Sequence, residues 1–329
     1  MVQLLVMGAG LIGSRHVHAI KAHPVCQLAG VIEPDTSRHE SGDVDYYTSL
    51  DEIDKKIDGV VIATPTGLHF ENAVNVIERG FHMLIEKPVT ATPEEADRLA
   101  SLLAPTSLHC LVGHHRRYHP SIQLLKKWIA DNEIGTPITS SLIWAMRKPD
   151  SYFEGNWRAS DGSPVMINLI HDIDLMRFIL GDIIEVTGFG SAHCRQESRI
   201  ESGAVALRFV SGLCATISFA DSAVSPWGFE AGTGENPHIG TTGQDMWWIT
   251  GRDGSISFPS LTRWGGAQDW SQPAQPVEFT SDVTVPLTAQ LDHFAAVIKG
   301  EEAPLITVSD AAASLKATWD IEALFSAQI

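Results

Sequence analysis

The pattern that most constrains the fold of this chain is Gly8-Ala9-Gly10-Leu11-Ile12-Gly13, which fits G-x-G-x-x-G. It follows the short apolar run Val2–Met7 and precedes a segment, 11–22, with helical spacing. In this context Gly8 permits a tight turn, Gly10 lets the backbone approach a pyrophosphate, and Gly13 lets the helix pack closely on the strand. The helix N-terminus adds unpaired N–H donors and partial positive charge. The pattern therefore predicts a dinucleotide-binding strand, turn and helix.

An acidic residue at the end of the second predicted strand indicates which dinucleotide binds. Glu33 follows the apolar run 28–32, about twenty positions after the glycine turn. A carboxylate at this place accepts hydrogen bonds from the ribose hydroxyls and repels a 2′-phosphate. The sequence therefore predicts NAD rather than NADP, with Arg38 as the nearby cation that could tolerate the phosphate.

Apolar runs and helical segments alternate through the first third of the chain. Short apolar runs recur at 28–32, 59–63, 82–85 and 108–112, and segments of helical spacing lie at 68–79 and 93–103. Strands that alternate with helices indicate a parallel sheet with helices on both faces. We therefore expect an α/β fold that begins with a doubly wound Rossmann domain, residues 1–119.

The pattern changes after residue 119. Several strand-like runs follow one another from 186 to 258 without a long helix between them, which is typical of an antiparallel sheet. Helical segments at 119–130, 165–180, 287–299 and 309–326 surround these runs and a further strand at 138–146. We expect a second, α+β domain over 120–329 with a large, mostly antiparallel open sheet. The segment 221–244, rich in Gly, Pro and Thr, is expected to be a lid, a subunit-crossing arm or a plain surface excursion.

Composition excludes several classes of function. The chain has 329 residues, enough for two cores, and its 23 basic against 40 acidic residues leave a net charge of −17. That charge disfavours nucleic acid and anionic membranes as partners. The four cysteines form no C-x-x-C pair and are expected to be buried thiols, and the N-terminus shows no membrane span or leader, so a cytoplasmic location is expected. No metal site is expected either, because neighbouring histidines in 114–119 would point to opposite faces of a strand.

Lys87 is the first candidate for proton transfer. It lies in Glu86-Lys87-Pro88, directly after the apolar run 82–85, and so at a carboxyl end of the parallel sheet, where such folds bind ligands. A lysine beside a positively charged nicotinamide is suited to proton transfer. The alternative is a plain surface charge.

His171 is the second candidate. It lies on the predicted helix 165–180 with Asn168, Asp172 and Asp174, which are unusual polar residues on an otherwise apolar helix. A histidine can transfer a proton near neutral pH, and a carboxylate can orient it. The alternative is a core histidine with satisfied hydrogen bonds.

These motifs together resemble the Gfo/Idh/MocA family, dehydrogenases similar to inositol dehydrogenase and glucose-fructose oxidoreductase. The resemblance spans nearly the whole chain, and its most specific elements are Glu-Lys-Pro and His-x-x-Asp. It implies a Rossmann domain followed by an α/β domain whose open sheet pairs face to face in homodimers or homotetramers. The residues that carry it are Gly8–Gly13, Ala63-Thr64-Pro65 with His69, Glu86-Lys87-Pro88, 113–120, Trp157-Arg158 and His171-Asp172-Ile173-Asp174.

The resemblance also implies roles for individual residues. Lys87 would bind the reacting hydroxyl and relay its proton, His171 would be the general acid and base, and Asp174 would bind substrate. Glu86 would lie by the nicotinamide ribose, and the Lys87–Pro88 bond is expected to be cis. Further substrate contacts are expected from Arg158, Asn168 and Asp172, and the cofactor contacts from Gly8, Gly10, Leu11, Ile12, Gly13, Glu33, Arg38, Thr64, Pro65, His69, Glu86 and Lys87.

The expected activity is NAD-dependent, reversible hydride transfer involving a secondary alcohol of a sugar, cyclitol or related polyhydroxy compound. One departure from the inositol dehydrogenase pattern is Ile167, where that pattern has an aspartate four residues before the histidine. Arg147, Lys148 and Arg158 leave a carboxylated cyclic or sugar-acid substrate open. Two other hypotheses stay open. The protein could be a non-catalytic NAD-binding sensor, or an enzyme whose tightly held cofactor is reduced by one sugar and reoxidised by another.

Overall fold

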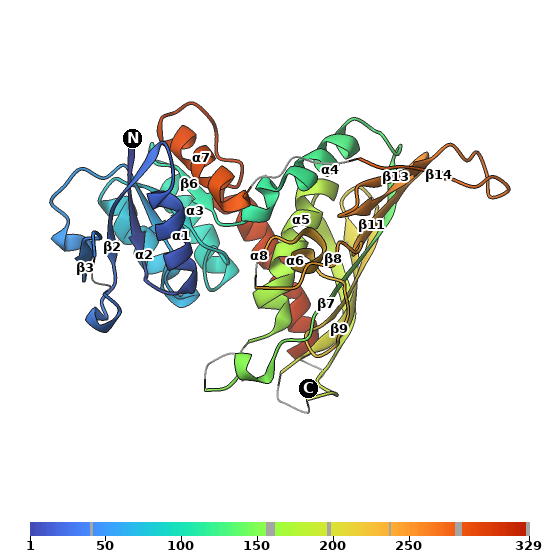
Figure 1. Ribbon diagram of the computed structural model, residues 1–329, viewed down its shortest axis with the longest axis horizontal. Helices are drawn as coiled ribbons and strands as arrows, with labels where there is room; N and C mark the ends of the chain where they lie inside the picture. Colours follow the sequence, from blue (N-terminus) through green and yellow to red (C-terminus); the bar gives the residue numbers. More distant parts are fainter. Residues whose placement is uncertain (40–41, 156–161, 196–198, 237, 280–284, 327–329) are drawn as a thin grey trace. The chain divides into compact units, whose positions relative to one another are not determined.

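The computed structural model describes residues 1–39, 42–155, 162–195, 199–236, 238–279 and 285–326, and the chain divides into two compact units. Unit 1 contains Met1–Tyr118 and Thr284–Leu315, and unit 2 contains His119–Val283 and Lys316–Ile329. Each unit is built around its own sheet, a six-stranded one in unit 1 and an eight-stranded one in unit 2 (Figure 1). The parallel first sheet and the mostly antiparallel second sheet confirm the predicted fold class.

The sheet of unit 1 is parallel, with strand order β3-β2-β1-β4-β5-β6. The strand order reverses at β1 and β4, which is where doubly wound sheets bind nucleotides. Helices α1 and α7 pack beside each other, as do α2 and α3. The elements are β1 (Val2–Met7), α1 (Leu11–Lys21), β2 (Cys26–Ile32), β3 (Tyr46–Tyr47), β4 (Gly59–Ile62), α2 (His69–Glu78), β5 (His82–Ile85), α3 (Pro93–Leu103), β6 (Cys110–Val112) and α7 (Pro286–Ile298).

Local sequence explains why these elements form where they do. Strand β4, Gly-Val-Val-Ile, is buried along its whole length, as expected for a parallel strand that helices cover on both faces. Helix α3 begins at Pro93, whose missing N–H is harmless in a first turn. The Thr92 side chain caps this helix by accepting a hydrogen bond from the Glu95 N–H.

Residues 285–315 pack with unit 1, which differs from the expectation that all of 120–329 forms the second domain. The reason is apolar packing on the first sheet. A Cβ at Gly59 on β4 would lie 3.0 Å from the Phe294 ring and 2.9 Å from Ile298, so α7 approaches this strand closely. Farther along, the Val112 N–H of β6 donates to the Ile306 carbonyl. Helix α8 (Val308–Ser326) begins in unit 1 and ends in unit 2.

Unit 2 has an eight-stranded sheet of order β14-β13-β12-β11-β7-β10-β9-β8, in which only the β7–β10 pair is parallel among the pairs that the structure describes. Helices α4, α5 and α8 contribute to a common apolar core with its strands. The strands are β7 (Pro137–Ala145), β8 (Ile183–Ser191), β9 (Ser202–Phe209), β10 (Cys214–Ala220), β11 (Trp247–Gly251), β12 (Gly254–Phe258), β13 (Thr262–Gly265) and β14 (Gln275–Val277), and the helices are α4 (Pro120–Ala130), α5 (Ile170–Leu180) and the short α6 (Phe229–Thr233).

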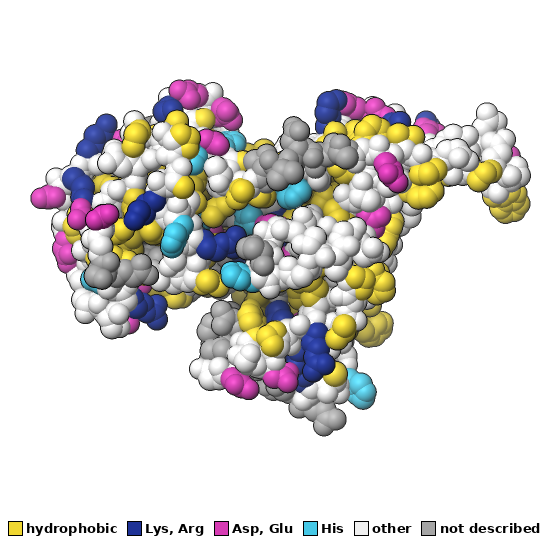
Figure 2. Space-filling view, viewed as in Figure 1, with side chains coloured by type: hydrophobic (Ala, Val, Ile, Leu, Met, Phe, Trp, Pro, Cys, Tyr) yellow, Lys and Arg dark blue, Asp and Glu magenta, His cyan; other side chains and the backbone are white. Residues whose placement is uncertain are grey.

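The two faces of this sheet differ in burial. On β9 the side chains of Val205 and Leu207 are buried and face the helices, whereas Ala204 and Ala206 are exposed. The same alternation runs along β10, where Thr216 and Ser218 are exposed. Figure 2 shows hydrophobic side chains along the outer margin of unit 2 and at the tip of the projecting β13–β14 hairpin, where Trp270 is fully exposed.

The expectation that all four cysteines are buried needs correction. Cys26 and Cys110 are buried thiols, but Cys194 and Cys214 are exposed, Cys214 because it occupies an outward position of β10. In the segment 221–244, Asp221 is buried, and Phe229 of α6 stacks on Phe258.

Candidate functional site

The glycine turn joins β1 to α1 at the carboxyl edge of the first sheet. Gly8 has φ +103°, and a Cβ there would lie 2.8 Å from the Ala63 carbonyl oxygen. A Cβ at Gly13 would lie only 1.9 Å from the Gly8 carbonyl oxygen, so this glycine allows the helix to contact the turn. Gly10 is different, because its hypothetical Cβ has open space around it. Since Gly10 also provides no side-chain cap for α1, the helix N-terminus can receive an anion there.

Glu33 lies directly after β2 and is held by the backbone around the glycine turn. Its Oε2 accepts a hydrogen bond of 2.9 Å from the Ala9 N–H, and its Oε1 accepts one of 3.1 Å from the Asp35 N–H. Arg38 is more than half exposed, and its guanidinium lies 3.4 Å from Asp35 and 4.0 Å from Glu33. The carboxylate predicted to contact the ribose is therefore fixed beside the turn, and the arginine is an exposed neighbour.

The Glu86-Lys87-Pro88 turn follows β5 at the same edge of the sheet. Glu86 is buried, and its Oε1 lies 2.8 Å from Nε2 of His16, a fully buried residue of α1. Its Oε2 accepts a hydrogen bond of 3.2 Å from the Lys87 N–H. Burial opposes ionisation, but the hydrogen bond from His16 and the nearby charges of His115 and Lys87 hold the pKa of Glu86 below its usual value. Glu86 is therefore a buried carboxylate at neutral pH.

A second histidine holds the other side of this turn. His69, at the start of α2, has Nδ1 2.8 Å from the Pro88 carbonyl and Nε2 2.9 Å from the Thr64 carbonyl. Burial lowers the pKa of His69, and the contacts with these carbonyls oppose that shift. Pro65 directly precedes the 3₁₀ turn that leads into α2. The Lys87–Pro88 bond is cis, as expected.

The candidates of the second unit lie on one continuous helical segment. A π-helical turn, Val165–Leu169, contains Asn168 and continues into α5, which contains His171, Asp172 and Asp174. All three α5 residues are buried. Asn168 Oδ1 is a buried atom without a hydrogen-bond partner among the residues that the structure describes. Single π turns inside helices are frequent at functional sites because they alter the side chains that the helix presents.

The candidates thus form two groups, each within one unit. Unit 1 brings together the glycine turn, Glu33, the Glu86–Lys87 turn and His69, whereas Asn168 and His171 belong to unit 2. Arg158 lies outside the described residues, as does its neighbour Trp157. Within the described part of the chain, no group of three or more His, Cys, Asp and Glu side chains is arranged to hold a metal ion.

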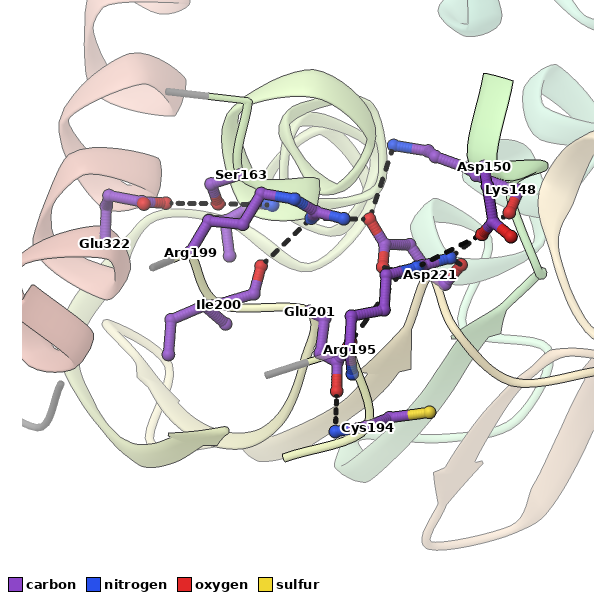
Figure 3. A network of polar contacts seen from close by, with 11 residues as sticks. Lys148, Asp150, Ser163, Cys194, Arg195, Arg199, Ile200, Glu201, Asp221 and Glu322 are labelled. Atoms are coloured by element: carbon purple, nitrogen blue, oxygen red, sulfur yellow. Dashed lines mark hydrogen bonds and ion pairs between the residues drawn. The ribbon is translucent and has the colours of Figure 1, made fainter. Parts of the chain in front are cut away.

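A cluster of buried charges in unit 2 includes Lys148, one of the residues that suggested a carboxylated substrate. Asp221 is fully buried and accepts hydrogen bonds of 2.6 Å from Arg195 and 2.9 Å from Arg199, and Lys148 Nζ lies 3.9 Å away (Figure 3). Glu201, also buried, accepts hydrogen bonds from the N–H groups of Cys194 and Arg195. A carboxylate of the chain itself therefore already faces Lys148. Arg147, by contrast, is exposed.

Two features of these sites were not expected from the sequence. His16 is one, although it follows Gly13 by three residues and so shares the inward face of α1, which was the available signal. The Asp221 cluster is the other. Its members come from chain segments that are far apart in the sequence, and no local pattern joins them.

Models of two domains of one family match the chain. The first, described as "Oxidoreductase family, NAD-binding Rossmann fold", matches residues 2–114, and the second, "GFO/IDH/MocA C-terminal domain", matches residues 122–257. The chain belongs to the Gfo/Idh/MocA oxidoreductase family. The resemblance drawn from its motifs is confirmed, and residues 2–114, which lie in unit 1, match the Rossmann-fold domain of this family. No helix within the described ranges is both long and apolar enough to cross a membrane.

The proteins similar to this chain carry the names of different dehydrogenases. UDP-N-acetylglucosamine 3-dehydrogenase of Acidithiobacillus ferrooxidans is 32% identical over 198 residues, 57% of this chain and 59% of that protein. The scyllo-inositol 2-dehydrogenase (NAD(+)) of Bacillus subtilis is 26% identical over 345 residues, covering 96% of this chain and 91% of that protein. A solved structure of the WlbA dehydrogenase from Bordetella pertussis, in complex with NADH and UDP-GlcNAcA, aligns with a TM-score of 0.78 and 21% identity over 100% of this chain and 97% of that one.

Proposed function

We propose that the protein is an NAD-dependent dehydrogenase that oxidises a secondary alcohol of a sugar, cyclitol or related polyhydroxy compound. The observation that carries the proposal is the placement of Lys87. It follows the buried Glu86 at the carboxyl edge of the sheet that also carries the glycine turn, and hydrogen bonds from two other segments hold its own turn. Ligands of doubly wound sheets bind at this edge.

The residues at this edge fit a dinucleotide. Gly10 leaves open space at the uncapped N-terminus of α1, which suits a pyrophosphate. Glu33 offers a fixed carboxylate for the ribose hydroxyls, and its charge supports NAD over NADP. The other proposed cofactor contacts are Leu11, Ile12, Gly13, Arg38, Thr64, Pro65, His69 and Glu86. When bound, NAD takes up the hydride that leaves the substrate carbon.

Lys87 and His171 are the proposed catalytic residues. Oxidation of a secondary alcohol to a ketone breaks one C–H and one O–H bond, so a base must accept the hydroxyl proton while the hydride leaves. We assign the binding of the reacting hydroxyl and the relay of its proton to Lys87, and general acid and base catalysis to His171. Asp172 and Asp174, both buried near His171 on α5, and Arg158 are further proposed substrate contacts.

Asn168 supports a polyhydroxy substrate because its side chain offers an acceptor for a hydroxyl group. It lies one helical turn before His171, beside the position where the inositol dehydrogenase pattern has an aspartate. Its side-chain oxygen is buried and has no hydrogen-bond partner among the described residues, so it can accept a hydrogen bond from a substrate hydroxyl. An amide can supply this acceptor without the charge of an aspartate.

A carboxylated substrate receives less support. Lys148 faces the buried Asp221, and Arg147 is exposed. The names of the relatives include an inositol dehydrogenase and a sugar-nucleotide dehydrogenase, which supports an alcohol on a ring as the reacting group. Because Lys148 and Arg147 give no clear carboxylate site, we place neutral sugars and cyclitols before sugar acids, while the UDP-GlcNAcA of the WlbA complex supports the sugar-acid alternative.

A second copy of the chain is the proposed partner of the large sheet. The outward side chains near the centre of this sheet are small and uncharged, whereas a sheet face turned to water usually carries charges. Flat faces of this kind suit packing against an identical sheet. The positions concerned are Ser141, Ala204, Ala206, Thr216 and Ser218.

The test of this function is a spectrophotometric assay of nicotinamide reduction. The purified protein would receive NAD or NADP with a panel of neutral sugars, cyclitols, sugar nucleotides and sugar acids. The proposal expects turnover of a neutral polyhydroxy compound with NAD and much slower turnover with NADP. NAD binding with silence across the panel would instead favour a non-catalytic sensor. A nucleotide that stays bound through gel filtration would favour an enzyme that recycles its own cofactor.

A further inference from the structure

His16 contacts the carboxylate of Glu86 in the turn that carries Lys87. It is fully buried on the inward face of α1, the helix that begins at the glycine turn. Its Nε2 lies 2.8 Å from Oε1 of Glu86, which comes from a segment 70 residues later. The pair therefore links the phosphate-binding helix to the turn that carries Lys87.

The geometry of Glu86 shows that its orientation is specified from several sides. While Oε1 contacts His16, Oε2 accepts the hydrogen bond from the Lys87 N–H. Gly113 leaves the room that the carboxylate occupies, because a Cβ there would lie 3.0 Å from Oε2. A carboxylate placed in this way is a fixed negative charge rather than a mobile surface group.

The histidine contributes a donor, and the surroundings indicate which nitrogen carries the proton. Nδ1 of His16 is buried and has no hydrogen-bond partner among the described residues, whereas Nε2 faces the carboxylate. A neutral imidazole with its proton on Nε2 satisfies Glu86 and avoids a buried N–H without an acceptor. In this tautomer the pair keeps one full negative charge.

The position of this charge within the sheet suggests what it acts on. Glu33, the predicted ribose ligand, lies at the end of β2, on one side of the point where strand order reverses. A dinucleotide crosses that point, so its nicotinamide half extends toward β4 and β5, where Glu86 lies. The oxidised nicotinamide ring is positively charged and the reduced ring is neutral, so a nearby fixed carboxylate favours the oxidised form.

We propose that His16 is a positioning residue that keeps Glu86 ionised and oriented beside Lys87, and that the pair makes the site prefer NAD over NADH. The inference rests on the proposed NAD-dependent function. It assigns His16 a role that packing alone does not require, because an apolar side chain would fill the same space without a partner for the carboxylate.

The experiment measures dissociation constants for NAD and for NADH separately, by titration calorimetry, and needs no substrate. His16→Gln keeps a donor near the Nε2 position, whereas His16→Leu removes it. His23→Leu is the matched control, because His23 is also a buried histidine facing a carboxylate, with Nε2 3.2 Å from Asp292, beyond the other end of α1. Thermal unfolding of each variant checks that it folds.

We expect His16→Leu to reduce the ratio of NAD affinity to NADH affinity by about tenfold. Without the donor of His16, Glu86 would no longer be held as a charged group beside the nicotinamide, and about tenfold is the effect of removing a nearby charge at an intermediate effective dielectric constant. His16→Gln and His23→Leu should keep the wild-type ratio. An unchanged ratio in His16→Leu, or equal losses for both nucleotides, would overturn the proposal and leave His16 a packing residue. A His16→Gln protein that behaves like His16→Leu would also overturn it, because the donor would then be irrelevant.

A second variant keeps the test decisive if His16→Leu does not fold. Glu86→Gln preserves shape and removes the charge, and it should reduce the ratio by a similar factor. Where the double variant with His16→Leu folds, it should lose little more than Glu86→Gln alone, because the two residues act as one unit. An unchanged ratio in Glu86→Gln would contradict the proposal. Failure of the wild-type protein to bind either nucleotide would instead contradict the proposed function itself.

Discussion

The N–H of Ala9 donates a hydrogen bond of 2.9 Å to Oε2 of Glu33 and so joins the glycine turn to the end of the second strand. The other carboxylate oxygen accepts from the Asp35 N–H. Both contacts use backbone donors, so the main chain itself orients the Glu33 carboxylate. This relationship places an acidic group where a ribose hydroxyl would lie and is the structural basis for the proposed preference for NAD.

Replacement of Glu33 should change the cofactor preference. In Glu33→Ser the acceptor for the ribose hydroxyls is shortened and the charge that repels a 2′-phosphate is removed, so the affinity for NAD should fall about tenfold or more. The affinity for NADP should rise, with Arg38 close enough to approach the phosphate. Titration calorimetry with both nucleotides measures the effect. Unchanged affinity for both nucleotides would show that Glu33 does not face the ribose.

Substitutions at Gly10 and Gly13 should have different effects: the first should weaken cofactor binding, and the second should lower stability. Gly10→Val should fold normally, because φ at Gly10 is −74° and a Cβ there has open space, but it should weaken NAD binding at least about tenfold by filling that space. Gly13→Ala should lower the free energy of unfolding by roughly 2 kcal/mol or more, because the added Cβ would overlap the Gly8 carbonyl oxygen. Thermal unfolding and nucleotide titration of both variants test the pair. Normal NAD binding in Gly10→Val would place the pyrophosphate elsewhere.

Asp221 should be important for the stability of unit 2. Asp221→Ala leaves the cations of Arg195 and Arg199 without their shared carboxylate and should cost roughly 3 kcal/mol of unfolding free energy. Asp320→Asn is the control, because Asp320 pairs with Lys316 on an exposed helix face, and it should leave stability unchanged. Urea denaturation compares the two variants. Equal stability of both would mean that the buried cluster contributes no more than a surface ion pair.

The outward face of the large sheet should govern assembly. Ala206→Glu introduces a charge at the centre of this face, opposite Thr216 on β10, and should convert the proposed dimer or tetramer into smaller species. Ser101→Glu, on the exposed side of α3, should leave the assembly unchanged. Light scattering coupled to size-exclusion chromatography gives the mass of each. A wild-type monomer, or an assembly that tolerates Ala206→Glu, would exclude this face as the interface.

Much of unit 1 was predictable because its determinants are local. The glycine turn, the acidic residue after β2 and the apolar strands are each recognisable from a short stretch of sequence. The start of α1 follows from the glycine turn, and that of α3 from Pro93 and helical spacing. The family of the chain could also be recognised from the sequence, because its specific motifs are short and contiguous.

Features that depend on distant contacts were not predictable. The packing of 285–315 within unit 1 depends on the contact between Phe294 and Gly59, and no pattern within α7 specifies that partner. The hairpin strands β12, β13 and β14 are short and contain polar residues, so their alternation is weak. Glu86 was identified from its motif, but its partner His16 lies on another element and only the fold brings the two together.

The most direct test of the proposed catalytic role of Lys87 compares wild type with Lys87→Ala and Lys87→Arg, using the substrate that the panel assay identifies. We predict that Lys87→Ala binds NAD like wild type but loses turnover by at least about a hundredfold, because the relay of the hydroxyl proton is absent. Lys87→Arg should fail similarly, since a guanidinium does not give up a proton near neutral pH. Turnover that persists in Lys87→Ala with unchanged NAD binding would contradict the assignment of Lys87 as the catalytic lysine.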